Sequence, residues 1–219
     1  LINNISGAFG AFRRDFLKQI GGWDTHTAED LDLTVRIKQY FKRYPNLKIP
    51  YATASIAHTD APQSFKELVL QRLRWDGDLL FLYLRKHWPA FSPKLLGWKN
   101  FLFTLFYGYL QNVMLPFVIF VYFVGVAIIY PWQFSLALIF VIYALYLLTI
   151  GYFYLLVLVS VSERPKQDFT LFLWLPLYPI YAFIMRLICC FALVNEVFRR
   201  SHEESSMAPW WVLKRGQKF

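Results

Sequence analysis

A stretch of 62 residues, from Phe101 to Ser162, contains no Asp, Glu, Lys or Arg. A helix that spans a bilayer needs roughly 20 mainly apolar residues, so this stretch is long enough for two such helices. The whole chain is 57% hydrophobic and 20% aromatic, whereas soluble domains are usually roughly 45–50% apolar. These features exclude an ordinary water-soluble globule, and they exclude an intrinsically disordered chain.

Charged residues are concentrated in the first hundred positions, which hold 15 Lys+Arg and 9 Asp+Glu. We therefore expect an α/β part followed by an α-helical membrane region. The expected parts are a water-facing domain over 1–95, two to four spans over 96–198 and a basic cytoplasmic tail over 199–219. Because the chain begins with Leu1 and not with Met, we expect it to be the C-terminal part of a longer protein.

The apolar half divides into three stretches. One span is expected to end at Tyr130-Pro131-Trp132, a second runs from about Phe134 to Val161, and a third runs from Phe169 to Val197 and is broken by Pro176 and Pro179. Three full spans would leave the tail outside, although basic segments favour the cytoplasm. Either the third stretch is a proline-broken hairpin or lies in the interface, or the first stretch holds an interfacial helix.

The water-facing part shows local signals for four elements. The sequence predicts a short helix over 13–20 that ends at Gly21-Gly22, a helix over 28–43 capped by Thr27, a strand over 51–58, and a helix over 65–86 that begins with the capping box Ser64-x-x-Glu67.

The first candidate site is Glu29-Asp30 at the start of a predicted helix. Acidic side chains in a first turn often serve only to offset the helix dipole. The functional alternative is a general base, since a carboxylate held at a helix start can take a proton from an attacking hydroxyl.

The second candidate site lies on the helix that leads toward the membrane. Gln71, Arg74 and Trp75 share one helix face because they are spaced i, i+3 and i+4, and Arg72 lies beside them. An amide, a guanidinium and an indole on one face would suit a phosphate next to a sugar ring. The alternative is an amphipathic interfacial helix with snorkelling arginines.

The third candidate site is the segment Ser6-Gly7-Ala8-Phe9, followed by Arg13-Arg14. Small residues let a ligand approach the backbone closely, although a tight turn before a helix would use the same residues. The four histidines are scattered, so the sequence predicts no metal ligands in this chain.

In this order, the motifs resemble the second half of a membrane-embedded family 2 glycosyltransferase, the group of cellulose, chitin, hyaluronan and poly-N-acetylglucosamine synthases. The layout is most similar to the bacterial poly-β-1,6-N-acetylglucosamine synthase branch. The matching residues are Ser6-Gly7-Ala8-Phe9 through Arg13-Arg14, Gly21-Gly22-Trp23-Asp24, Ala28-Glu29-Asp30 and Gln71-Arg72-Leu73-Arg74-Trp75. The chain departs from the family at Ala28, where the family usually has Thr.

The resemblance implies a GT-A fold and site roles for several residues. Asp30 would be the catalytic base with support from Glu29. Arg74 and Gln71 would hold the donor diphosphate, Trp75 would stack beneath the acceptor sugar, and Gly7 with its neighbours would line the acceptor pocket. The family also implies Mg²⁺ or Mn²⁺, but its Asp-x-Asp motif lies upstream of this chain, so we expect the chain alone to be inactive.

We therefore expect a processive, inverting transferase that uses a UDP-sugar, extends a β-linked polysaccharide acceptor and passes it across the bilayer. It would be a multi-pass protein of the inner or plasma membrane with a cytoplasmic catalytic part. No nucleic acid is expected as a partner, and an accessory membrane subunit is a candidate one. The alternatives are a non-processive transferase to a lipid carrier, and a transporter or membrane scaffold.

Overall fold

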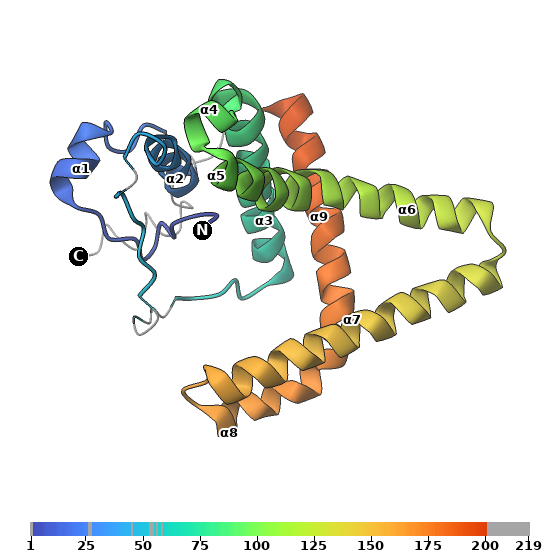
Figure 1. Ribbon diagram of the computed structural model, residues 1–219. Helices are drawn as coiled ribbons and strands as arrows, with labels where there is room; N and C mark the ends of the chain where they lie inside the picture. Colours follow the sequence, from blue (N-terminus) through green and yellow to red (C-terminus); the bar gives the residue numbers. More distant parts are fainter. Residues whose placement is uncertain are drawn as a thin grey trace. The chain divides into compact units, whose positions relative to one another are not determined.

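The computed structural model describes residues 2–25, 28–44, 46–52, 55, 57 and 59–200 (Figure 1). These residues form two compact units. The first takes in the chain up to Leu115 together with the residues from Cys189 on, and the second is Pro116–Ile188. Each unit is described by itself.

The first unit begins with two helices that the sequence predicts, α1 (Arg14–Gln19) and α2 (Glu29–Tyr40). α1 ends at the predicted glycines, because the N–H groups of Gly21 and Gly22 bond back to the carbonyls of Lys18 and Leu17. Both glycines have positive φ, +84° and +64°, a conformation that other residues adopt only with strain.

The cap of α2 differs from the prediction. Its N-cap is Ala28, which makes no side-chain hydrogen bond and adopts a left-handed conformation with φ 43° and ψ 43°. The predicted cap, Thr27, lies outside the described residues. An alanine in this conformation costs about 1–2 kcal/mol, so backbone strain lies directly before Glu29 and Asp30.

The long second helix forms as α3 (Phe65–Leu80) and continues directly into a π-helical segment, η1 (Phe81–Lys86). Ser64 caps it by accepting a hydrogen bond from the N–H of Glu67 at 3.2 Å. Glu67 accepts from the N–H of Gln63 at 2.9 Å, one residue before the position that a capping box would use. Two short elements follow, η2 (Trp88–Ala90) and α4 (Pro93–Leu96).

The α/β prediction is not confirmed by the described residues, which contain no strand. Within the predicted strand, positions 51, 52, 55 and 57 are described and have no regular structure. Thr53, Ala54, Ile56 and His58 lie outside the described residues, so the strand stays a prediction.

Helix α2 is buried on two sides. Leu31 and Val35 pack with Leu82 and Tyr83 of η1 in one apolar cluster. Leu33 and Ile37 pack with Ile20 at the end of α1 in another. The apolar positions predicted for this helix thus serve two separate contacts, and one of them joins α2 to the helix formed by α3 and η1.

Within the described residues, three helical runs are long and apolar enough to cross a membrane: Trp98–Ile129, Trp132–Ser160 and Pro165–Arg199. The first run comprises α5 (Trp98–Phe103), η3 (Thr104–Met114) and α6 (Leu115–Ile129). The second run is the single helix α7 (Trp132–Ser160). The third run comprises α8 (Pro165–Asp168), η4 (Phe169–Leu177) and α9 (Tyr178–Arg199). The break between the first two runs falls at Tyr130-Pro131, as predicted.

The third apolar stretch forms one helical run, Pro165–Arg199, which excludes the proline-broken hairpin, one of the three alternatives that the sequence left open. Pro176 is accommodated inside a 3₁₀ segment, η4, after which the chain continues directly as α9. Within the second unit, η4 lies beside α7 (Figure 1), and the hydroxyl of Tyr143 donates to the carbonyl of Pro176 at 2.9 Å.

Candidate functional site

The carboxylate of Asp30 is held at the start of α2 by three N–H groups. Oδ2 accepts from the side-chain amide of Asn4 at 2.8 Å and from the backbone N–H of Gly7 at 3.2 Å. Oδ1 accepts from the N–H of Leu31 at 2.7 Å. The structure therefore joins the predicted base to the predicted Ser6-Gly7-Ala8 segment across 23 positions of sequence.

Both predicted acidic residues lie close to Gly7, so a side chain at this position would crowd them. A Cβ atom at this position would be 3.2 Å from Cβ of Asp30 and 3.4 Å from Oε1 of Glu29. Ser6, Gly7 and Ala8 are all exposed, and a turn forms where the N–H of Phe9 bonds to the carbonyl of Ser6 at 3.3 Å. The segment thus presents an accessible backbone next to two carboxylates.

Thr34 is a supporting residue that sequence reasoning missed. Its hydroxyl accepts from the N–H of Ile5 at 2.9 Å and lies 2.7 Å from the carbonyl of Asp30 and 3.1 Å from Oδ1 of Asn4. It therefore fixes the segment at residues 4–5 against the turn of α2 that carries Asp30. The sequence signal for this role is that Thr34 lies four residues after Asp30, so both residues share one face of the helix.

On α3, the guanidinium of Arg72 lies 4.9 Å from the ring centre of Trp75, and the indole is 48% exposed. Arg72 therefore orients the indole through a cation–π contact. Its Nε is buried with no hydrogen-bond partner. Gln71 and Arg74 are half-buried on the same helix.

The structure connects the two predicted site regions through their helices. Ala28 and Leu79 both pack against the apolar cluster shared by α2 and η1. Leu79 lies one helical turn after Trp75. The meeting of Asp30 with Gln71, Arg74 and Trp75 in one pocket stays a prediction.

A buried ionic cluster lies next to this site, and sequence reasoning did not identify it. Asp32 is 0% exposed. Its Oδ1 is 2.9 Å from Nζ of Lys86 and 2.8 Å from Nε2 of His87, and its Oδ2 is 2.8 Å from Nε of Arg36. The sequence offered only a third acid in a first turn, because the partners at 86 and 87 are more than fifty positions away.

Burial by itself would raise the pKa of Asp32. The hydrogen bonds from His87 and Lys86 and the charges of Arg36 and Lys86 act in the other direction and hold the pKa of this carboxyl well below its usual range. Asp32 is therefore a permanent anion at neutral pH.

Lys38, on the same helix, is a second buried charge. Its Nζ donates to the carbonyl of Asn3 at 3.0 Å and lies 5.7 Å from the ring centre of Phe103. Burial lowers its pKa to about 8. This lysine ties the N-terminal segment to α2.

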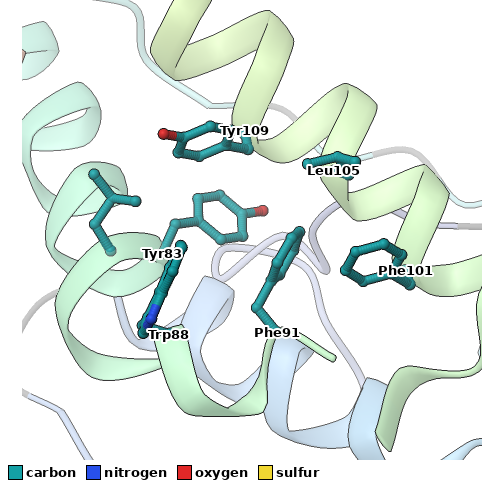
Figure 2. Close-up of a pocket in the computed structure, with 7 residues that line it drawn as sticks. Tyr83, Trp88, Phe91, Phe101, Leu105 and Tyr109 are labelled. Atoms are coloured by element: carbon teal, nitrogen blue, oxygen red, sulfur yellow. The ribbon is translucent and has the colours of Figure 1, made fainter. Parts of the chain in front are cut away.

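An aromatic cavity of about 310 Å³ lies between η1, η2 and the helix that starts at Trp98. Figure 2 shows the ring of Tyr83 between those of Tyr109 and Phe91. The lining residues are Tyr83, Leu84, Trp88, Phe91, Phe101, Leu105 and Tyr109. The hydroxyl of Tyr83 is buried and has no hydrogen-bond partner.

A divalent metal does not fit the residues at hand. Within the described parts of the chain, no group of three or more His, Cys, Asp or Glu side chains could hold a metal ion. The neighbouring acids also have other partners: Asp32 is bound to cations of the chain, and Asp30 accepts from N–H groups.

Comparison with known proteins gives two results. Residues 4–196 match the family model for glycosyl transferase family group 2. Over 96 residues the chain is 32% identical to a poly-beta-1,6-N-acetyl-D-glucosamine synthase of Staphylococcus epidermidis (strain ATCC 35984) and 31% identical to a second synthase of that name from Staphylococcus epidermidis. These matches cover 44% of the chain and 22% of each relative. No solved structure matches.

Proposed function

We propose that this chain, which belongs to glycosyl transferase family group 2, carries the catalytic base and the acceptor-binding elements of a processive, inverting glycosyltransferase. The donor would be a UDP-sugar and the product a β-linked polymer of N-acetylglucosamine, the sugar that the names of the two relatives contain. The single observation that carries the proposal is the Asp30 carboxylate, which is held by Asn4 and by the backbone of Gly7 beside an exposed loop.

In the proposed reaction, Asp30 accepts the proton of the acceptor hydroxyl while that oxygen attacks C1 of the donor sugar. The bond between C1 and the diphosphate oxygen breaks, and the diphosphate leaves with the electron pair. Attack from the face opposite the leaving group inverts C1, so an α-linked donor gives a β-linked product. The three N–H bonds to Asp30 orient the carboxylate before reaction, as general base catalysis requires.

The remaining site residues have binding roles in this proposal. Arg74, helped by Gln71, binds the donor diphosphate, since a guanidinium can make two parallel hydrogen bonds to phosphate oxygens. Trp75, oriented by Arg72, stacks against the acceptor sugar. Ser6, Gly7 and Ala8 line the acceptor pocket through their backbone, and Glu29 supports the base.

We assign no step to Mg²⁺ or Mn²⁺, because the described residues do not offer a site for either ion. If the enzyme uses such an ion, we expect its ligands to come from residues upstream of this chain.

The domain organisation that we propose follows the sequence. Residues 1–95 belong to a cytoplasmic GT-A catalytic domain, residues 96–198 form the membrane region, and residues 199–219 form a basic cytoplasmic tail. The three apolar helices are long enough to cross a bilayer, and they would provide the polymer's route across the inner or plasma membrane. An accessory membrane subunit is a further proposed partner.

The decisive experiment is Asp30→Asn in the full-length protein, assayed in membranes for transfer of labelled N-acetylglucosamine from its UDP donor. Loss of a general base should lower the rate by about 10²–10⁴-fold. Asp15→Asn, an exposed carboxylate on α1, is the matched control and should leave the rate unchanged. An unaltered rate in Asp30→Asn would remove this residue from the mechanism.

Product length separates polymer synthesis from transfer of a single sugar to a lipid carrier. Trp75→Ala removes an aromatic surface whose stacking would retain the acceptor between additions. We expect the variant to release shorter chains at a lower rate, measured by gel filtration of the labelled product. A wild-type enzyme that adds one sugar per acceptor would exclude processivity.

A further inference from the structure

The buried ionic cluster connects the two helices that carry the proposed site, although the proposed reaction does not use it. Asp32 lies on α2, two residues after Asp30. Lys86 and His87, which bind its Oδ1, lie at the end of η1. η1 continues α3 without interruption (Figure 1), so these contacts pin the helix that carries Trp75 to the helix that carries Asp30.

The same cluster holds the loop after α1. Arg36 binds Oδ2 of Asp32 and also donates to the carbonyls of Ile20, at 2.8 Å, and Gly22. Lys86 donates to the carbonyl of Asp24 at 3.0 Å. Asp32 therefore pairs with both cations that fasten residues 20–24, and Lys86 has a second, longer ion pair with the carboxylate of Asp24 at 3.4 Å.

Both oxygens of this carboxylate are needed as acceptors. Since Oδ1 faces Lys86 and His87 while Oδ2 faces Arg36, an amide in place of the carboxylate would present an NH₂ group to one side. That group cannot accept a hydrogen bond from a cation. The contacts to His87 also require that its Nε2 carries a hydrogen.

We propose that Asp32 is a positioning residue for glycosyl transfer. Through Lys86 and His87 it fixes the position of Asp30 on α2 relative to the proposed substrate-binding side chains on α3, which are Gln71, Arg74 and Trp75. The inference rests on the proposed function. Asp32 touches no substrate, and its effect comes from alignment, where a displacement of about 1 Å can cost about 100-fold in rate.

The test uses Asp32→Asn in the full-length enzyme in membranes, with sugar transfer from UDP-N-acetylglucosamine measured per folded molecule. We expect kcat to fall by about 100-fold, while KM for the donor changes by less than about threefold because the binding side chains remain. Asp15→Asn again serves as the matched control.

A double variant and two variants of His87 separate positioning from a local effect of the removed charge. Asp32→Asn combined with Lys86→Met restores the net charge and removes one of the cations that lose Asp32 as a partner in the single variant. A merely structural role predicts that kcat returns, whereas a positioning role predicts that kcat stays low. His87→Ala should lower kcat, and His87→Gln, whose amide N–H can replace Nε2–H, should recover part of it; this pair decides the question if Asp32→Asn does not fold.

The outcomes are distinguishable from those for the base. If Asp30→Asn is inactive while Asp32→Asn keeps a normal kcat, the positioning role is wrong and the proposed function stands. If Asp30→Asn is active, the proposed function itself fails. Recovery of kcat in the charge-balanced double variant would also overturn the positioning role.

Discussion

Replacement of Lys38 by Met tests the energetics of the buried charge on α2. The pKa of this lysine falls from 10.5 to about 8 on burial. A tenfold change in protonation equilibrium is worth about 1.4 kcal/mol, so holding the charge in the fold at pH 7 costs about 3 kcal/mol of unfolding free energy. Methionine has a similar length and no charge, and it avoids this cost.

The variant also loses the hydrogen bond from Nζ to the carbonyl of Asn3, which is worth about 1 kcal/mol net. At pH 7 we therefore expect Lys38→Met to be more stable than wild type by about 2 kcal/mol.

The difference should depend on pH in a defined direction. Below pH 8 the lysine is charged in both the folded and the unfolded protein, and the full cost is present. Between pH 8 and 10.5 the folded amine is neutral while the unfolded one still binds a proton, so wild type gains stability as pH rises. By pH 10 less than about 1 kcal/mol of the cost remains, and the advantage of the methionine should disappear.

The measurement is urea-induced unfolding of both proteins in detergent micelles at pH 7 and pH 10, followed by tryptophan fluorescence. Lys42→Met changes an exposed lysine two residues after the end of α2 and controls for general effects of charge and pH. A Lys38→Met protein that is less stable than wild type by the same amount at both pH values would refute the reasoning.

Three other predictions concern stability and are measured in the same way. Tyr83→Phe removes a buried hydroxyl without a hydrogen-bond partner, so stability should be unchanged or higher by up to about 1–3 kcal/mol; a clear loss would mean that the hydroxyl is bonded. Gly22→Ala places a side chain at φ +64° and should cost about 1–2 kcal/mol, a result that an unshifted unfolding midpoint would contradict. The pKa of Asp32 is lower in the folded protein than in the unfolded one, so the ionised carboxylate stabilises the fold above the unfolded pKa of about 3.9 and this stabilisation is lost as the pH falls. Asp32→Asn should therefore be much less stable than wild type at pH 7, and the difference in unfolding free energy should narrow toward pH 2.

The helices of this chain could be predicted because their signals are local. Gly21 and Gly22 end α1, Ser64 caps the long helix, and the absence of charge between 101 and 162 marks two of the helical runs that are long and apolar enough to cross a membrane. A proline-broken hairpin was one of the alternatives for the third apolar stretch. It did not form, because the 3₁₀ segment that contains Pro176 leads directly into α9.

The residues of the candidate site could be predicted from the sequence more fully than the buried residues that hold them in place. Small residues at 6–8 and acids at 29–30 pointed to one place, and the bond from Gly7 to Asp30 shows that these two parts meet. Asp32 and Lys38 were not among the predicted site residues. Their burial depends on partners such as His87 and Phe103, which come from distant segments, and helical periodicity alone does not reveal such partners.

The burial of α2 on two opposite sides limits how this enzyme could be modified. A helix that is packed against Ile20 on one side and against Leu82 on the other cannot turn about its axis without disturbing both contacts. Attempts to engineer the acceptor preference proposed above should therefore leave the helix untouched and vary the exposed side chains of Ser6, Ala8 and Phe9. They should keep Gly7 and Gly10, where a Cβ atom would lie 3.2 Å from Cβ of Asp30 and 2.9 Å from the carbonyl oxygen of Ser6.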